Sequence, residues 1–203
     1  MSKKLVIVES PAKAKKINSF LGSDYKVMAS VGHVRDLPPK KLGVDPEKGF
    51  EPEYAETSRG KKILKELKDV AKTCETIYLA PDPDREGEAI AWHLFEALKK
   101  AASEDNFYRV TYNEVTKSAI LSAFNNPQKI DMNRVNAQQA RRVLDRLVGF
   151  QGSPVVRRQI RGANSVGRVQ TVALRLVVER EFEIESFTSE KYFTVGAQVR
   201  KPV

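Results

Sequence analysis

The sequence predicts an α/β fold, a mostly parallel sheet with helices on both faces, followed by a mainly α-helical segment. Two observations predict it. Short apolar runs are each followed almost at once by a helical pattern, and strands that alternate with helices form parallel sheets. Beyond about residue 125 the strand patterns disappear, and helical patterns continue almost to the end of the chain.

The first strand–helix unit occupies residues 4–22. The stretch "KLVIVE" has four consecutive apolar residues and ends at Glu9, which is typical of a buried strand. Ser10 is placed to cap the next helix, Pro11 suits the first helical position, and Gly22 suits its end. The loop between this strand and its helix is therefore very short.

Two further strands follow the same pattern. "TIYLA" (76–80) precedes the helix "REGEAIAWHLFEALKK" (85–100), and "YRVTYN" (108–113) precedes a helix that Thr116 would cap. Residues 37–60, which are rich in Pro, Gly and charge, are expected to form an excursion from the sheet.

The last third of the chain is expected to be helical. An Asn-Asn-Pro break lies within residues 124–131, and three helical patterns follow it, the second opened by Ser-Pro. Residues 190–203 alternate like a strand and then stop, which suggests a fragment of a longer protein. We predict a sheet domain at 1–125, a helical segment at 126–190, and the truncated start of a further domain at 191–203.

The positive charge is concentrated in one block. The net charge is +9, and ten arginines between Arg134 and Arg180, against only Asp145 and Glu179, contribute +8 of it. No lysine occurs in this block. An arginine guanidinium can donate two hydrogen bonds to one phosphate, so this block favours nucleic acid as the partner. The alternative is that the arginines only form the solvent-exposed face of the helices.

Composition excludes several other classes of protein. The chain is 41% hydrophobic and 30% charged, which is typical of a soluble globular protein. Its N-terminal apolar run of four residues is too short for a signal peptide or a membrane span. Cys74 is the only cysteine, so an internal disulfide and a multi-cysteine zinc site are excluded. We therefore expect a cytoplasmic protein with no membrane partner.

Four carboxylates are expected to gather at one edge of the sheet. Glu9 ends one strand, Asp82 and Asp84 lie in the turn after another, and Glu86 opens the next helix. Clustered carboxylates stay ionised only beside a cation, and an all-oxygen site suits Mg²⁺. Alternatively, Asp84 only caps the helix, and the negative charge of Glu86 stabilises the positive end of the helix dipole. We assign this dipole role to Glu88 under either interpretation. That alternative explains neither Asp82 nor Glu9.

Lys13 lies in the first helical turn after Glu9. It is placed to meet a phosphate whose other oxygens lie on the metal. Glu9 is the best candidate to move a proton, because it comes from a different strand than Asp82 and Asp84. This is the arrangement of phosphoryl transfer, in which the protein mainly positions groups and neutralises charge.

These motifs resemble a known family. A strand ending in Glu, followed by a strand ending in "DPDREGE", resembles the Toprim domain of topoisomerases, primases and some nucleases. Successive motifs from Leu5 to Ile184 resemble the bacterial type IA DNA topoisomerases in family order. They are "LVIVESPAKAKKI", "SVGHVRDLP", "DPDREGEAIAWHL", "YNEVTKSAI", "ARRVLDRLVGF" and "SVGRVQTVALRLVVEREFEI".

The resemblance implies an enzyme that relaxes negatively supercoiled DNA by breaking, passing and rejoining a single strand. Glu9 would be the acid/base, Lys13 would stabilise the charge on the scissile phosphate, and Asp82, Asp84 and Glu86 would hold Mg²⁺. We expect a monomer of the bacterial cytoplasm, associated with the nucleoid, that uses no small-molecule cofactor.

The resemblance also implies which residues hold the single strand in the helical, DNA-binding segment. Ordinary alternatives exist for most of them: an i,i+4 surface pair for Arg141 and Asp145, and a cap and turn around Gly167. Arg168 near a helix start is unfavourable to the helix dipole, so a purely structural role explains it less well. For His33, a structural role is the alternative to a DNA contact. The candidates are Arg141, Arg142, Asp145, Ser165, Gly167, Arg168 and Gln170, with His33 and Arg85 as further possibilities.

The nucleophile of the family has no counterpart in the sequence. The family breaks DNA with a tyrosine in a motif resembling Y-x-R-T-D-S, and none of the six tyrosines here has that context. The chain alone is therefore expected neither to cleave nor to relax DNA, and residues 191–203 would begin the arch domain. Two alternatives stay open: another Toprim enzyme, either a primase or a metal-dependent nuclease, and a non-catalytic single-stranded-DNA-binding module.

Overall fold

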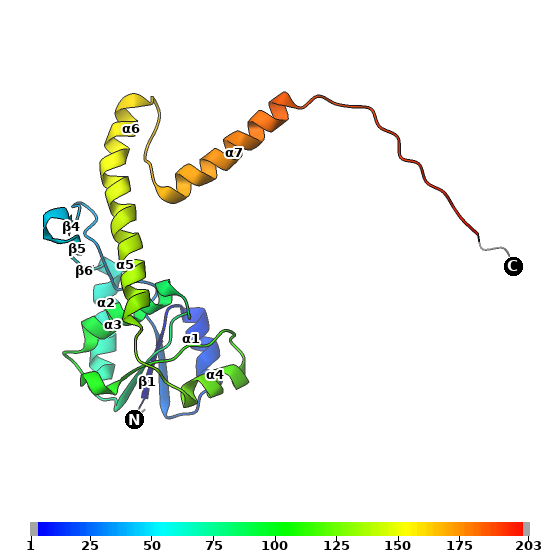
Figure 1. Cartoon of the computed structure of the whole chain (residues 1–203). Coiled ribbons are helices and arrows are strands. Elements are labelled where there is room, and N and C mark those ends of the chain that lie inside the picture. The colour runs from blue at the N-terminus through cyan, green and yellow to red at the C-terminus, as the bar shows by residue number, and fades with distance from the viewer. Residues whose placement is uncertain (1–3, 201–203) are drawn as a thin grey trace. The chain divides into compact units, whose positions relative to one another are not determined.

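The computed structural model describes residues 4–200. Within them, the largest sheet has four strands in the order β2-β1-β7-β8, and every neighbouring pair is parallel (Figure 1). The α/β fold expected from the sequence is therefore confirmed. The four strands are β1 (Lys4–Val8), β2 (Tyr25–Ala29), β7 (Thr76–Leu79) and β8 (Phe107–Arg109).

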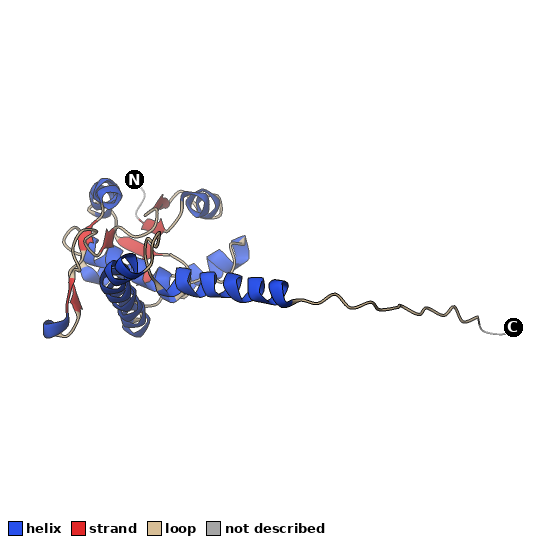
Figure 2. Cartoon of the chain, turned by 90° about the horizontal axis from the view of Figure 1, so that it is seen from above, coloured by secondary structure: helices blue, strands red, loops and turns tan. Residues whose placement is uncertain are grey.

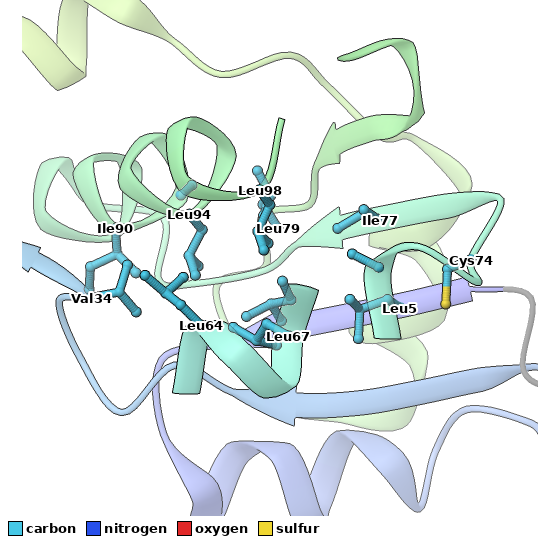
Figure 3. Packing of buried hydrophobic residues seen from close by; sticks show 13 residues of the cluster. Leu5, Val34, Leu64, Leu67, Cys74, Ile77, Leu79, Ile90, Leu94 and Leu98 are labelled. Atoms are coloured by element: carbon cyan, nitrogen blue, oxygen red, sulfur yellow. The ribbon is translucent and has the colours of Figure 1, made fainter. Parts of the chain in front are cut away.

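Helices cover both faces of this sheet, because successive strand residues point to opposite faces. On one face, Leu5 and Ile7 of β1 pack with α2 and α3; on the other, Val6 and Val8 pack with α1 and α4. Figure 3 shows the first of these cores, with its strand leucines and isoleucines against the leucines of α2 and α3. The four helices are α1 (Pro11–Asn18), α2 (Ser58–Ala71), α3 (Arg85–Leu98) and α4 (Lys117–Asn125).

Side-chain caps begin all four of these helices. Ser10 accepts a hydrogen bond from the Lys13 N–H, and Asp84 accepts one from the Gly87 N–H at 2.7 Å. Thr57 and Thr116 cap α2 and α4 in the same way. The caps expected at Ser10, Asp84 and Thr116 are thus present. Each one starts its helix directly after the preceding strand or loop.

The excursion after residue 36 packs on a helix, not on the sheet. It forms two small antiparallel ribbons, and Leu37 and Val44 from it are buried against Val143 of helix α5 (Met132–Leu147). Helix α5 also packs closely along α3. The ribbons pair β3 (Arg35–Asp36) with β6 (Ala55–Glu56) and β4 (Val44–Asp45) with β5 (Glu51–Pro52), and the single turn η1 (Pro46–Lys48) joins the latter two.

The chain divides into two compact units, one up to Phe150 and one from Gln151 onward. A π-helical turn, η3 (Val148–Gly152), continues α5. The second unit contains α6 (Ser153–Gln159) and α7 (Arg168–Ser186), so the three helices expected in the last third are present. Val166 donates a backbone hydrogen bond to the Ser153 hydroxyl, which ties the start of α6 to the segment before α7.

Two strand predictions need correction. "YRVTYN" forms a strand only over Phe107–Arg109, after the short turn η2 (Glu104–Asn106), because the neighbouring β7 ends at Leu79 and Val110 makes the last bond to it. The described part of the segment 190–203 is neither helix nor strand, as Figure 2 shows, since an alternating pattern forms a strand only with a partner to pair with. Residues 201–203 lie outside the described residues.

Strand β2 and most of helix α2 were not anticipated, and neither were the four short strands of the two ribbons. Strand β2 is only half-buried, because it lies at the edge of the sheet. Helix α2 follows the Pro- and Gly-rich excursion directly, and its cap, Thr57, falls inside it. No helix within residues 4–200 is long and apolar enough to cross a membrane.

Candidate functional site

The carboxyl ends of β1 and β7 form the edge at which the candidate site lies. From β1 the chain crosses to β2 on one side, whereas β7 connects to β8 on the other side, so the segments leaving these neighbouring strands diverge. Such a reversal is where parallel sheets bind ligands. Glu9 follows β1 and Asp82 lies in the loop after β7, so the expected neighbourhood of these two acids is present.

Lys13 joins the two strand ends. Its ammonium group pairs with Glu9 Oε1 and, at 2.5 Å, with Asp82 Oδ1. Burial alone would lower the Lys13 pKa, but its hydrogen bonds with Asp82 and Glu9 outweigh burial and raise the pKa. Lys13 therefore carries its charge at neutral pH, between two carboxylates.

The loop after β7 is tightly constrained. Gly87, in the first turn of α3, leaves no room for a side chain, because a Cβ atom there would collide with the Asp82 carbonyl. The Arg109 guanidinium donates to the carbonyls of Pro81 and Asp82, at 2.8 and 2.6 Å, and to that of Leu79. Arg109 is only 1% exposed. It holds the backbone that presents Asp82, and it is the most important residue of the site that our sequence reasoning missed.

Our expectation that Glu88 only stabilises the helix dipole was wrong. It is 2% exposed and forms a buried ion pair with Arg109, whose Nε lies 2.9 Å from Glu88 Oε2. Its other oxygen accepts the Asp131 N–H, at the cap of α5. Glu88 faces inward because β8 and the start of α5 cover this side of α3. An arginine within an apolar strand pattern was the available signal.

Glu86 contacts a different set of residues from Lys13. Its carboxylate is 2.6 Å from His33 Nε2 and accepts a hydrogen bond from Gln138 Nε2 of α5 at 3.1 Å. Asp84 is exposed and caps α3, and Arg85, the first residue of that helix, is exposed beside it. Asp84 and Glu86 are thus engaged by partners other than Lys13.

The donor set fits a magnesium ion, although the acids are not gathered around one point. Within residues 4–200, no three acidic, histidine or cysteine side chains lie close enough together to hold a metal ion as they stand. However, Glu9 Oε2 is buried and has no hydrogen-bond partner among the described residues. Mg²⁺ keeps several waters and needs only one or two carboxylates, so the oxygen donors at this edge suffice for it.

Helix α5 brings three of the predicted strand-binding residues together. Arg141 and Asp145 form an i,i+4 pair, with Arg141 Nε 3.8 Å from Asp145 Oδ2. Arg142 donates two hydrogen bonds to the Asp36 carboxylate, from Nε to Oδ1 at 3.0 Å and from Nη2 to Oδ2 at 2.5 Å. A hollow of about 260 Å³ opens at the end of this helix, lined by Arg142, Asp145, Arg146, Gly149 and Phe150. The arginine side chains around it suit a phosphate or the face of a base.

The remaining predicted strand-binding residues surround the start of α7, in the second unit. Gly167 is the N-cap residue, Arg168 opens the helix, and the Gln170 side chain lies against Gly167. Ser165, Arg168 and Gln170 are exposed. A helix start with an exposed arginine is a suitable place for an anion, because the N–H groups of the first turn point toward that end.

Comparison with known proteins supports one family throughout. The Toprim domain family matches residues 4–115, and a DNA topoisomerase family matches residues 129–202. "DNA topoisomerase 1" of Rickettsia typhi is 53% identical over 200 residues, covering 97% of this chain and 26% of that protein. The protein of the same name from Rickettsia prowazekii is 54% identical over the same shares.

A solved structure agrees with these relatives. Full-length topoisomerase I from Thermotoga maritima superposes with a TM-score of 0.79 at 49% identity, over 91% of this chain and 31% of that one. The chain therefore spans about a quarter of the length of the relatives it matches.

Proposed function

Because this chain belongs to the type IA DNA topoisomerase family and includes its Toprim domain, we propose that it provides the acid-bearing half of a topoisomerase active site. The reaction would be the breakage, passage and rejoining of one DNA strand through a 5′-phosphotyrosine, which relaxes negative supercoils. The observation that carries this proposal is the Glu9–Lys13–Asp82 cluster at the diverging ends of β1 and β7.

Glu9 and Lys13 would act on the scissile phosphate. When the tyrosine, having lost its phenol proton to water, bonds to phosphorus as a phenolate, the bond to the 3′-oxygen breaks and that oxygen takes a proton from Glu9. Rejoining reverses both events and returns the proton to Glu9. The Lys13 ammonium, held at the same edge, would stabilise the negative charge that develops on the phosphate oxygens. The buried, unpartnered Glu9 Oε2 supports this role.

Asp82, Asp84 and Glu86 would hold Mg²⁺. When bound, the ion would neutralise phosphate charge during rejoining and strand passage. Replacing Asp82 and Asp84 together by Ala should lower the Mg²⁺ affinity of the chain in isothermal calorimetry at least tenfold. The control is Asp69→Ala with Asp105→Ala, which removes two acids elsewhere on the surface. Equal Mg²⁺ affinity in the site variant and the wild type would remove these residues from the metal site.

Each unit would contribute its own contacts to the single strand, from α5 in the first and from the start of α7 in the second. Arg141, Arg142 and Asp145 would contact it in the first unit, and Ser165, Gly167, Arg168 and Gln170 in the second, with His33 and Arg85 near the metal. Negatively supercoiled DNA contains single-stranded regions, which these residues would bind. We further propose that the protein is a monomer of the bacterial cytoplasm and acts at the nucleoid.

A complementation experiment tests the proposal. None of the six tyrosines has the family's nucleophile context, so the chain alone should neither cleave nor relax plasmid DNA. Adding a polypeptide that carries the Y-x-R-T-D-S segment of a relative should restore cleavage with a covalent protein–DNA adduct, and Glu9→Gln should abolish it. Cleavage by the chain alone without an adduct would indicate a nuclease instead. Relaxation by the chain alone that depends on one of its own tyrosines would also overturn the proposal.

A further inference from the structure

A small polar cavity lies between the Glu86 end of the site and helix α5. It has a volume of about 100 Å³. Its lining contains no aliphatic side chain, so it is a polar space, partly open to solvent at Glu86. The lining residues are His33, Asp36, Tyr54, Glu86, His93, Gln138 and Arg142.

Three buried polar atoms around this cavity have no hydrogen-bond partner among residues 4–200: Tyr54 Oη, His93 Nδ1 and Gln138 Oε1. His93 is 2% exposed and Gln138 5% exposed. An unsatisfied buried polar atom destabilises a folded protein, so three of them on residues that line one cavity are unfavourable in a purely structural arrangement. A cavity of this size and lining suits a few hydrogen-bonded water molecules.

Gln138 connects the two functional parts of the first unit. Its amide donates to Glu86, a proposed metal ligand, at 3.1 Å. One turn further along α5, Arg142 grips Asp36 on the far wall of the same cavity. A DNA phosphate that recruits Arg142 would compete with Asp36, so the strand would act at Arg142 and the cation at Glu86, two residues that line the same cavity and lie next to successive turns of α5.

We propose that Gln138 is a positioning residue that couples strand binding on α5 to cation binding at Glu86. The inference rests on the proposed function, because it takes Arg142 as a strand contact and Glu86 as a metal ligand. Gln138 orients the Glu86 carboxylate, and any shift of α5 on binding the strand reorients that carboxylate. Coupling of this kind is reciprocal: the strand changes the Mg²⁺ affinity by the same factor by which Mg²⁺ changes the affinity for the strand.

The test uses two adjacent glutamines of α5. Gln138→Leu removes the amide from the cavity, whereas Gln139→Leu makes the same change at a residue that lines a separate groove beside Phe50. The affinity of a fluorescent oligo-dT for the 203-residue chain is measured with and without Mg²⁺ at constant ionic strength. Calorimetry then gives the Mg²⁺ affinity with and without the oligonucleotide. Screening by Mg²⁺ acts equally on all three proteins.

We expect a coupling factor of about fivefold or more in the wild type and in Gln139→Leu, and a factor near one in Gln138→Leu. Gln138→Met repeats the measurement with a flexible side chain of similar length, should Gln138→Leu fail to fold. Unchanged coupling in the Gln138 variant, or none in the wild type, would overturn this inference while the proposed function stands. A wild-type chain that binds neither probe would overturn both.

Discussion

The two compact units of the chain bury their side chains to very different extents. In the first, β1 and β7 are almost completely buried, and even the charged pair Arg109–Glu88 is inside. In the second, no residue of α7 is buried, and apolar side chains such as Leu174, Leu176 and Phe182 are about 63% exposed. The first unit thus fixes its site by its own packing. In the second unit, the segment before Arg168 is held to α6 by the hydrogen bonds of Val166 with Ser153 and of Arg157 with the Asn164 carbonyl, without a buried core around α7.

The largest expected effect comes from the Arg109–Glu88 pair. Arg109→Leu leaves the Glu88 carboxylate buried and uncompensated and removes a donor from the carbonyls of Pro81, Asp82 and Val110. We therefore expect a loss of about 3–5 kcal/mol in the free energy of unfolding. Arg175→Ala in α7 removes a similar ion pair at an exposed position and should cost about 0.5 kcal/mol or less. Urea unfolding checks both. Equal losses in the free energy of unfolding for the two variants would contradict the difference in burial between the two units.

A matched pair of leucines compares packing alone. Leu94 of α3 is fully buried against the sheet, and Leu176 of α7 is 63% exposed. Leu94→Ala should lower the free energy of unfolding by about 2–5 kcal/mol, whereas Leu176→Ala should change it by less than about 0.5 kcal/mol. Thermal unfolding of the two variants side by side provides the measurement. A large loss at Leu176 would show that α7 is packed in solution.

The pH dependence of stability should come from the first unit, which holds both histidines of the chain. Burial, with the nearby charges of His33 and Arg35, lowers the His93 pKa to about 3. The unfolded chain binds this proton near pH 6.5, so stability is full above that pH and falls as pH drops toward 3. The slope should approach about 1.4 kcal/mol per pH unit.

Unfolding free energies between pH 4 and 6.5 should therefore fall less steeply in His93→Phe, which cannot bind the proton. The aromatic ring keeps the contacts with Tyr54 and Trp92. An identical slope of unfolding free energy against pH in the variant and the wild type would show that His93 does not cause the pH dependence.

The smallest effect is expected in the second unit, on DNA binding. Arg168→Ala should weaken oligo-dT binding about three- to tenfold at low salt, and the loss should shrink as salt rises, with a salt slope smaller by about 0.7. Arg175→Ala in the same helix is the control, because it removes an equal charge outside the predicted strand-binding residues. Fluorescence anisotropy across a salt series measures both. Equal binding by Arg168→Ala at low salt would exclude Arg168 as a strand contact.

Local patterns predicted much of the first unit. The strands β1 and β7, the caps at Ser10 and Asp84, and the meeting of Glu9 with Asp82 all follow from residues close together in the sequence. Such features depend on side-chain alternation and on hydrogen bonds to the nearest backbone groups, which the sequence states directly. The prediction failed at Glu88, whose surroundings come from β8 and α5.

By itself, the sequence determined the α/β order of elements, the acids at the strand ends, the arginine-rich helices and the family to which the chain belongs. Only the tertiary structure decided which of these groups face one another: Lys13 between Glu9 and Asp82, Arg109 against Glu88, and Gln138 against Glu86. The reason is physical. Each pair joins residues from different elements, and side-chain contacts between elements depend on how helices pack on the sheet, which no local pattern specifies.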